Sequence, residues 1–283
     1  MNNSTDKKVS IIIRTFNESQ YIEELLMSIR SQTISDTEII IVDSESTDNT
    51  VQIASKYLNK LVQIKKAEFT FGYSLNKGIE VASSNNVILI SAHTKPLHSK
   101  WIENLITPLS NPEVAMTYGK QIGDSKSRYS EFRDLLRTFP SHPKVHTAPD
   151  FFSHNANSCL RKSFWDIHKF DETLTGQEDI EWARHWMLTG YTIFYEPNAP
   201  ILHSHYETNK QIKHRFKRES YAMKKLGLLN ISFIPVCLIR EILRGIIDLF
   251  QIGKHKNHKN KITDIFVYRY CKITGTISGI ISK

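Results

Sequence analysis

The sequence has little cysteine and no long apolar run, and both absences narrow what the protein can be. Its 283 residues include three cysteines, Cys159, Cys237 and Cys271, which stand far apart and form no CxxC pair. This spacing argues against a zinc knot or a disulfide framework and predicts reduced thiols in a cytoplasmic protein. The first residues, MNNSTDKK, lead directly into a strand, so we expect no signal peptide. We also expect no transmembrane helix, because no segment offers about 20 uninterrupted apolar residues.

The charge of the chain is unevenly distributed. The formal net charge is +8, and 40% of the residues are hydrophobic, as in an ordinary globular protein. From residue 210 to the end there are 16 Lys and Arg against 4 Asp and Glu, a net of +12, which leaves −4 for the remainder. The whole excess of positive charge therefore lies in the tail. Such asymmetry predicts an anionic partner, either a nucleic acid or a membrane.

The first hundred residues alternate between short β-branched runs and helical patterns. Strands are predicted at Val9–Ile13, Glu38–Asp43, Leu61–Lys65 and Val87–Ser91. Helices are predicted from about Ser19, around Val51–Leu58, and at Tyr73–Ser83. This order indicates an α/β, Rossmann-like fold with a mostly parallel central sheet flanked by helices. Ligands of such sheets bind beyond the carboxyl ends of the strands.

Polar side chains follow three of these strands at their carboxyl ends. The segments are Arg14–Glu18, Asp43–Ser46 and Ser91–His93. Each one taken alone fits a capped turn between a strand and a helix. Their coincidence at successive strand ends instead favours a site whose side chains bond a base, a ribose and a diphosphate.

The order of several motifs resembles the family 2 glycosyltransferases, which have the GT-A fold. The nucleotide-binding half is matched by VSIIIRTFNE, EIIIVDSESTDNT, NKGIEVA and the strand before SAHTKP. The acceptor half is matched by YGKQ, NANSCLRKSFW, FDETLTGQEDIEWA and GYTIFYEPNAPILHSH. The resemblance covers about residues 9–208, and FTFGYSLN and VDSESTD are most similar to transferases of bacterial surface polysaccharides, including rhamnosyltransferases. It implies a nucleotide-sugar half at 1–96, an acceptor and catalytic half at 97–208, and a basic helical extension at 209–283.

The resemblance also implies which residues bind the nucleotide. These are Arg14, Thr15, Asn17, Glu18, Asp43, Ser44 and Ser91. Ser44 stands where many members have a second aspartate, which leaves the identity of the base open. Arg14 replaces a common proline and is either a phosphate ligand or simply solvated.

Ser91 and His93 occupy the two positions of the family's DxD motif. In the usual arrangement the second aspartate helps to hold a divalent ion that screens the diphosphate. An imidazole at His93 favours Mn²⁺ over the harder Mg²⁺, and similar transferases draw a further ligand from the region of His203 and His205. Because residues two apart on a strand point to opposite faces, we expect only one of these two histidines to reach the metal. The alternative is that HSH is a polar strand end and that the site works without metal.

GQEDIEW resembles the segment that carries the catalytic base in this family. Transfer with inversion needs a carboxylate that takes a proton from the acceptor hydroxyl. Asp179 matches the catalytic aspartate and Glu178 lies beside it. Adjacent helical residues diverge by about 100°, so we do not expect both to point into the site. The alternative is an acidic first turn stabilised by the helix dipole.

Three further residues are candidates for the acceptor cleft. Asn155 and Asn157 lie in the matched NANSC motif, and Trp182 is placed to stack on a sugar. Trp182 fits the hydrophobic core equally well.

The tail contains the apolar stretch ISFIPVCLIREILRGIIDLFQIG. At helical spacing Leu238, Ile242, Ile246 and Leu249 share one face, whereas Arg240, Arg244 and Asp248 lie elsewhere. Apolar faces flanked by basic residues predict a helix lying in the plane of a membrane surface. The alternative is that the tail packs on the catalytic domain or on a partner subunit.

The sequence therefore predicts an inverting glycosyltransferase at the inner face of the cell membrane, cytoplasmic and peripheral. Its donor would be a UDP- or dTDP-linked sugar, and its acceptor a growing cell-surface polysaccharide or a lipid-linked glycan. We expect an anionic membrane surface as a partner and no nucleic acid, since nucleic-acid binding explains the basic tail but not the strand-end acids. A catalytically reduced binding or scaffold subunit of a polysaccharide-synthesis complex is the alternative that the missing DxD supports.

Overall fold

The computed structural model describes residues 9–254 and 262–282, which fold into two compact units. Unit 1 comprises Met1–Gln121, Pro140–Thr173 and Glu178–Leu202. Unit 2 comprises Ile122–Phe139, Leu174–Gln177 and His203–Lys283. The three-part division into 1–96, 97–208 and 209–283 stays a prediction.

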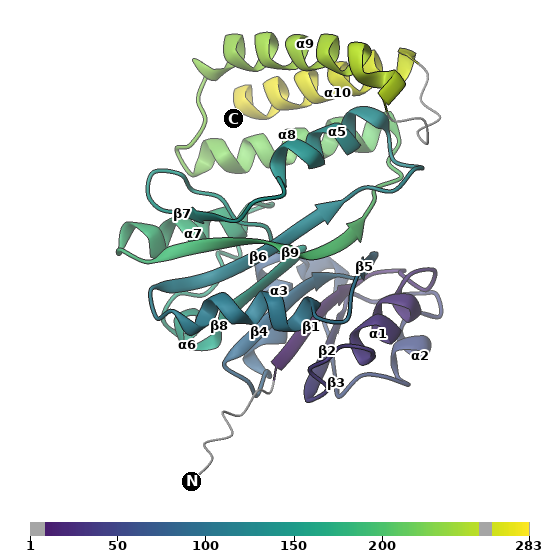
Figure 1. The fold of residues 1–283 in the computed structure, drawn as a ribbon, viewed down its shortest axis with the longest axis vertical. Coiled ribbons are helices and arrows are strands. Elements are labelled where there is room, and N and C mark those ends of the chain that lie inside the picture. The colour runs from purple at the N-terminus through teal and green to yellow at the C-terminus, as the bar shows by residue number, and fades with distance from the viewer. Residues whose placement is uncertain (1–8, 255–261, 283) are drawn as a thin grey trace. The chain divides into compact units, whose positions relative to one another are not determined.

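One sheet of nine strands dominates unit 1 in the described part of the chain (Figure 1). The strands are β1 (Val9–Thr15), β2 (Thr37–Asp43), β3 (Lys60–Gln63), β4 (Asn86–Ser91), β5 (Thr94–Pro96), β6 (Val114–Ile122), β7 (Lys144–His146), β8 (Asn157–Arg161) and β9 (Thr192–His203). Their order is β3-β2-β1-β4-β8-β6-β9-β5, and β7 pairs with β9.

The pairing directions bring the polar strand ends to one edge of the sheet. β1 is parallel to β2 and β4, and β2 is parallel to β3, which confirms the predicted parallel arrangement for these four strands. The register places Arg14 beside Ser91 and Thr15 beside Asp43. β8 runs antiparallel to both β4 and β6, so its first residue, Asn157, lies opposite Ile90 near the same edge.

Helices cover both faces of the parallel strands, which explains the continuous apolar runs Ile11–Ile13, Ile39–Val42 and Val87–Ile90. The helices of unit 1 are α1 (Ile22–Arg30), α2 (Thr50–Ala54), α3 (Phe71–Glu80), α4 (Trp101–Ile106), α6 (Lys162–Ile167) and α7 (Glu178–Leu188), with 3₁₀ turns at Lys66–Glu68 and Thr107–Ser110. Ile11 and Ile13 belong to the same core cluster as Ile22 of α1. Ile12 points to the other face, where a Cβ at Gly78 of α3 would lie 2.5 Å from its Cγ2. Alternate residues of β1 therefore serve two helical layers.

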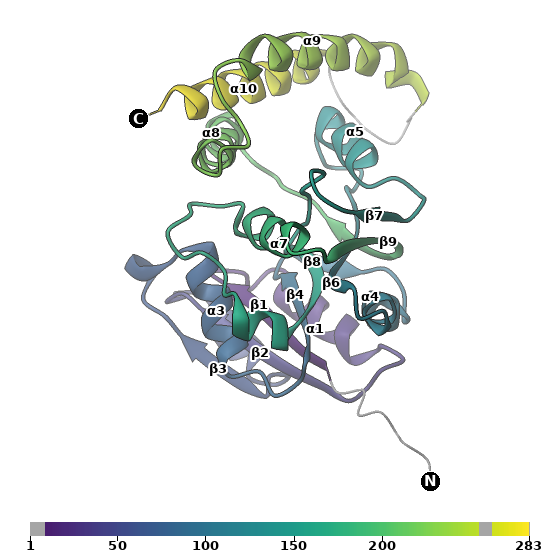
Figure 2. The ribbon, with the colours of Figure 1, turned by 90° about the vertical axis from the view of Figure 1, so that its left-hand side faces the viewer.

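Unit 2 is helical in its described part. It contains α5 (Tyr129–Thr138), α8 (Asn209–Lys225), α9 (Phe233–Gln251), a 3₁₀ turn at Ile252–Lys254, and α10 (Ile262–Ile281). Figures 1 and 2 show α10 running between α8 and α9. α8 begins with a capping box formed by Thr208 and Gln211. Gly275 of α10 allows a close approach to α8, because a Cβ there would lie 2.5 Å from the carbonyl oxygen of Lys213.

Two expectations from the sequence concern the cysteines and membrane-spanning helices. All three cysteines are free, as predicted, and all three are buried. None of the helices in residues 9–254 and 262–282 is apolar over a length sufficient to cross a bilayer.

Candidate functional site

The loops after β1 and β2 are joined around the carboxylate of Asp43. Thr15 Oγ1 donates a hydrogen bond to Asp43 Oδ1 at 2.9 Å. The Ser46 backbone NH donates to Asp43 Oδ2 at 2.9 Å, and the Ser46 hydroxyl donates to Oδ1 at 2.5 Å. Asp43 is almost completely buried, so its position is fixed by the two loops that it connects.

Asn17 ties the same two loops together from the other side. Its Oδ1 accepts a hydrogen bond from the Thr47 backbone NH at 2.8 Å, and its backbone NH donates to Ser46 Oγ at 2.9 Å. The residue has φ = 55°, in the left-handed region that asparagine adopts more readily than most residues. Asn17, which was predicted to bind the nucleotide, therefore holds the loops after β1 and β2 together.

Ser44 and Arg14 face the interior of this region. Ser44 is 2% exposed, and its Oγ has no hydrogen-bond partner among the described residues. A buried hydroxyl in that state costs free energy unless a ligand or water bonds it. The guanidinium of Arg14 lies 4.7 Å from the ring centroid of Phe71, the first residue of α3. Arg14 is thus held beneath the FTFG segment and is not simply solvated.

His93 is held by a carboxylate from another strand end. Its Nδ1 lies 3.2 Å from Glu18 Oε1, and its ring meets Tyr21 edge-on with centroids 6.4 Å apart. Metal-binding histidines are commonly oriented in this way by a carboxylate on the second ring nitrogen. Ser91 holds the turn that contains His93, because its carbonyl oxygen accepts a hydrogen bond from the hydroxyl of Thr94 at 2.7 Å.

The two acids at the start of α7 converge on Asn155. Asp179 Oδ2 accepts a hydrogen bond from the Asn155 backbone NH at 3.0 Å, and Glu178 Oε1 accepts one from Asn155 Nδ2 at 3.2 Å. Both acids are buried. Both side chains therefore reach the loop before β8, and the expectation that only one of them points into the site stays a prediction.

The environment makes both acids weaker than usual. Burial raises the pKa of Asp179 to about 6, although backbone hydrogen bonds and the charge of Arg14 act against it. Burial and the neighbouring Asp179 charge also raise the pKa of Glu178, again opposed by Arg14. A carboxyl with a pKa near 6 is largely ionised at neutral pH and still basic enough to take up a proton.

The other two acceptor candidates have structural contacts. Asn157 is completely buried, and its side chain bonds Trp101 Nε1 at 2.9 Å and the carbonyl oxygen of Ala199 at 2.8 Å. Trp182 is also completely buried and donates from Nε1 to the carbonyl oxygen of His168 at 2.7 Å. Trp182 therefore packs in the hydrophobic core, which is the second of its two predicted roles. Asn155 alone of the three contacts the acid pair.

His203 and His205 belong to unit 2, where their rings lie together with centroids 4.4 Å apart. The expectation that they point to opposite faces is wrong, because β9 ends at His203 and strand alternation does not extend to His205. His205 Nδ1 also lies 3.4 Å from Glu131 Oε1. The pair can therefore act together as nitrogen ligands.

Three contacts of the site were missed by sequence reasoning. They are the pairing of Glu18 with His93, the stacking of Arg14 on Phe71, and the bonding of both acids by Asn155. All three join residues more than 20 positions apart, so no local pattern reveals them. The aromatic residues of the FTFG segment are evident in the sequence, but nothing in the sequence indicates that Arg14 contacts them.

Comparison with known proteins places the chain among sugar-transferring enzymes. Residues 10–167 match the model of Glycosyl transferase family 2. The O-antigen chain rhamnosyltransferase RfbN of Salmonella typhimurium is 26% identical over 221 residues, which cover 74% of this chain and 70% of that protein. The uncharacterized glycosyltransferase RP339 of Rickettsia prowazekii is 31% identical and covers 71% of this chain and 66% of its own length.

Solved structures confirm the predicted GT-A fold class. The mannosyltransferase PcManGT from Pyrobaculum calidifontis, in complex with GDP-Man and Mn²⁺, superposes with a TM-score of 0.66 at 16% identity, over 97% of this chain and 87% of that one. Residues 1–349 of Staphylococcus aureus TarS with UDP-GlcNAc give 0.58 at 17% identity, over 94% and 90%. At these identities the likeness concerns the fold.

Proposed function

The chain belongs to glycosyl transferase family 2, and from this premise we propose that it transfers a sugar, with inversion, from a UDP- or dTDP-linked donor to a surface glycan. The acceptor is a growing bacterial cell-surface polysaccharide or a lipid-linked glycan. The O-antigen rhamnosyltransferases among the relatives support this acceptor class. The observation that carries the proposal is the buried Asp179 carboxylate beside the strand-end loops.

The nucleotide occupies the loops after β1, β2 and β4. Thr15, Asp43 and the backbone around them form a rigid floor, because their hydrogen bonds are made before any ligand arrives. The buried Ser44 hydroxyl takes a hydrogen bond from the base or the ribose. Arg14, next to Ser91 in the register, supplies positive charge toward the diphosphate.

Asp179 acts as the general base. Its carboxylate takes the proton from the acceptor hydroxyl while that oxygen bonds to the anomeric carbon of the donor sugar. The bond from this carbon to the diphosphate oxygen breaks at the same time, and the nucleoside diphosphate leaves. Asn155 is a positioning residue, since it holds both acids from one side.

A divalent ion, Mn²⁺ rather than Mg²⁺, fits the donor set that the chain offers. Imidazole nitrogens suit Mn²⁺ better than the harder Mg²⁺. We assign His93, His203 and His205 to it. When bound, the ion would screen the charge of the diphosphate. Glu18 orients the His93 ring for this role.

Thermal unfolding with each nucleotide tests the donor site. The protein would be melted with UDP, dTDP, GDP or CMP, each with Mn²⁺ and with EDTA. At about 100 times its Kd, a ligand that binds only the native state adds about 2.7 kcal/mol of stability. We expect a shift with UDP or dTDP that needs Mn²⁺. A shift of the melting temperature that is unaffected by EDTA would show that nucleotide binding needs no metal ion. No shift with any nucleotide would favour the scaffold alternative.

Two variants separate binding from catalysis. Asp179→Asn should keep the nucleotide shift and reduce transfer about 100- to 10,000-fold, the range for loss of a general base. His93→Ala should keep the fold but lose the Mn²⁺-dependent part of the shift. Undiminished transfer by Asp179→Asn would exclude this residue as the base.

A further inference from the structure

The polarity of α9 is reversed relative to that of a helix on the surface of a water-soluble protein. Among the described residues, every one of its exposed positions is apolar: Pro235, Val236, Leu238, Ile239, Ile242, Leu243, Ile246, Ile247 and Phe250. Its buried positions are Cys237, Glu241, Gly245 and Asp248. An amphipathic helix in water normally turns its apolar stripe to the core and its charges to solvent. α9 does the opposite.

The buried face of α9 is held by an ionic network. Arg269 of α10 lies 2.7 Å from Glu241 and 2.5 Å from Asp248, nitrogen to oxygen. Arg269 also contacts Asp134 of α5 at 2.8 Å, and Lys272 contacts the same carboxylate at 2.6 Å. Glu241 and Asp248 are completely buried. Because unpaired charges are costly to bury, these pairs fix which side of α9 faces α10 and α5.

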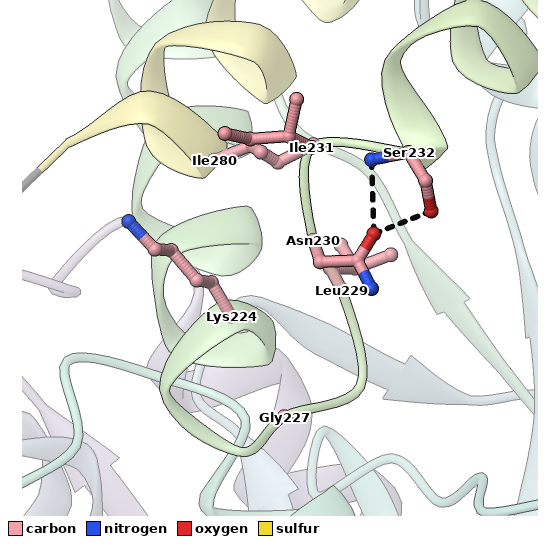
Figure 3. A pocket seen from close by; sticks show the side chains of 7 residues that line it. All are labelled: Lys224, Gly227, Leu229, Asn230, Ile231, Ser232 and Ile280. Atoms are coloured by element: carbon pink, nitrogen blue, oxygen red, sulfur yellow. Dashed lines mark hydrogen bonds between the residues drawn. The ribbon is translucent and has the colours of Figure 1, made fainter.

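Exposed apolar side chains of unit 2 also lie outside α9. Phe266 and Tyr270, one turn apart on α10, are 57% and 65% exposed. Before α9, a shallow hollow is lined by Leu229, Ile231 and Ile280 with Lys224 at its side (Figure 3). The nine exposed apolar positions along α9 form the kind of apolar surface that marks an interaction site in soluble proteins.

Charge decides between the two occupants that such a surface could take, a second copy of the chain or a lipid bilayer. Unit 2 has 20 Lys and Arg against 8 Asp and Glu, a net of +12, whereas unit 1 has a net of −4. A second unit 2 facing this surface would bring like charge against like charge. An anionic leaflet attracts it, since each basic residue near the surface contributes about 1 kcal/mol. We propose that the exposed face of α9 inserts into an anionic membrane surface.

The reversed polarity also defines how α9 lies in the lipid. Its polar face stays against α10 and α5 along the whole helix, so only the opposite face is available to the acyl chains. The helix of 19 residues is about 28 Å long, and it lies in the plane of the membrane with this face about 5–10 Å deep. The inference rests on the lipid-linked acceptor in the proposed function, and its test is independent of donor binding.

Flotation of the full-length protein with vesicles tests this surface. The vesicles would be phosphatidylcholine alone or mixed with phosphatidylglycerol. The variant Ile239→Gln/Leu243→Gln/Phe250→Gln removes three exposed side chains from α9. The matched control, Met27→Gln/Ile167→Gln/Leu188→Gln, removes three similarly exposed side chains from unit 1. We expect the α9 variant to lose partitioning into the mixed vesicles at least about tenfold, and the control to bind like the original protein.

Two results would overturn the proposal. One is unchanged vesicle binding by the α9 variant. The other is a stable dimer in sedimentation equilibrium that dissociates in this variant, which would make α9 a subunit interface. Because the replaced side chains are exposed, the melting temperature should stay unchanged, and a retained nucleotide shift would show that a failure concerns the surface and not the transferase.

Discussion

Asp179 owes its expected chemistry to its surroundings more than to its residue type. An aspartate in water is a weak base because its pKa is near 4. Here burial raises the pKa to about 6, while Arg14 and the NH groups around the carboxylate keep it from rising further. The side chain therefore stays ionised at neutral pH, yet binds a proton far more readily than an exposed aspartate.

The pH dependence of transfer follows from this pKa. Since only the carboxylate can accept the acceptor proton, kcat/KM should fall about tenfold for each pH unit below about 6 and level off above it. Steady-state rates across this range would measure the profile. In Glu178→Gln the step should persist, because burial, the main cause of the raised pKa of Asp179, remains. A flat profile down to pH 4 would contradict the assignment.

The helices of unit 2 pack through two different kinds of contact. α10 approaches α8 through glycine, as the predicted clash of a Cβ at Gly275 with the Lys213 carbonyl oxygen shows. α10 meets α9 through the ionic pairs of Arg269. The first kind of contact depends on the absence of a side chain, and the second on the pairing of buried charges.

Gly275→Ala should destabilise the protein by about 1–3 kcal/mol, because the methyl group forces backbone apart in a well-packed contact. Gly245→Ala is a matched control in α9. Its Cβ would lie 3.7 Å from Arg269 Cγ, an ordinary contact, so the better helix propensity of alanine should leave stability unchanged or raise it by up to about 1 kcal/mol. Urea unfolding of both variants would measure this. Equal effects would show that the α8–α10 contact is looser than described.

At the scale of the whole molecule, charge and polarity are distributed between the units. Unit 1 contains the strand-end loops and the acid pair and is net negative. Unit 2 contains the excess basic residues and the exposed apolar face of α9. The proposed base and the proposed membrane surface therefore belong to different units of one chain.

Vesicle binding should be sensitive to salt. Raising NaCl from about 0.1 M to about 1 M shortens the Debye length from about 10 Å to about 3 Å. Attraction between unit 2 and an anionic leaflet should then weaken, and flotation with mixed vesicles should decline at least about tenfold. Binding to phosphatidylcholine alone should be weaker and nearly independent of salt. Salt-independent binding to both would mean that charge has no part in attachment.

The sequence by itself determined the local features of this protein. Strands β1, β2 and β4 follow from β-branched runs, and the polar residues at their ends follow from the need to end a buried strand at the edge of a sheet. The order of the motifs identified the family and placed Asp179 after GQE. These features are readable because they depend on residues close together in the chain.

Tertiary structure alone decided which distant residues meet and which face of a helix is covered. Glu18 holds His93, and Asn155 holds Asp179, across separations that no periodicity reports. Periodicity showed that α9 has an apolar and a polar face, but not that the polar face is the buried one. That choice depends on Arg269, which pairs with the acids of α9 and with Asp134 only after α5, α9 and α10 have come together.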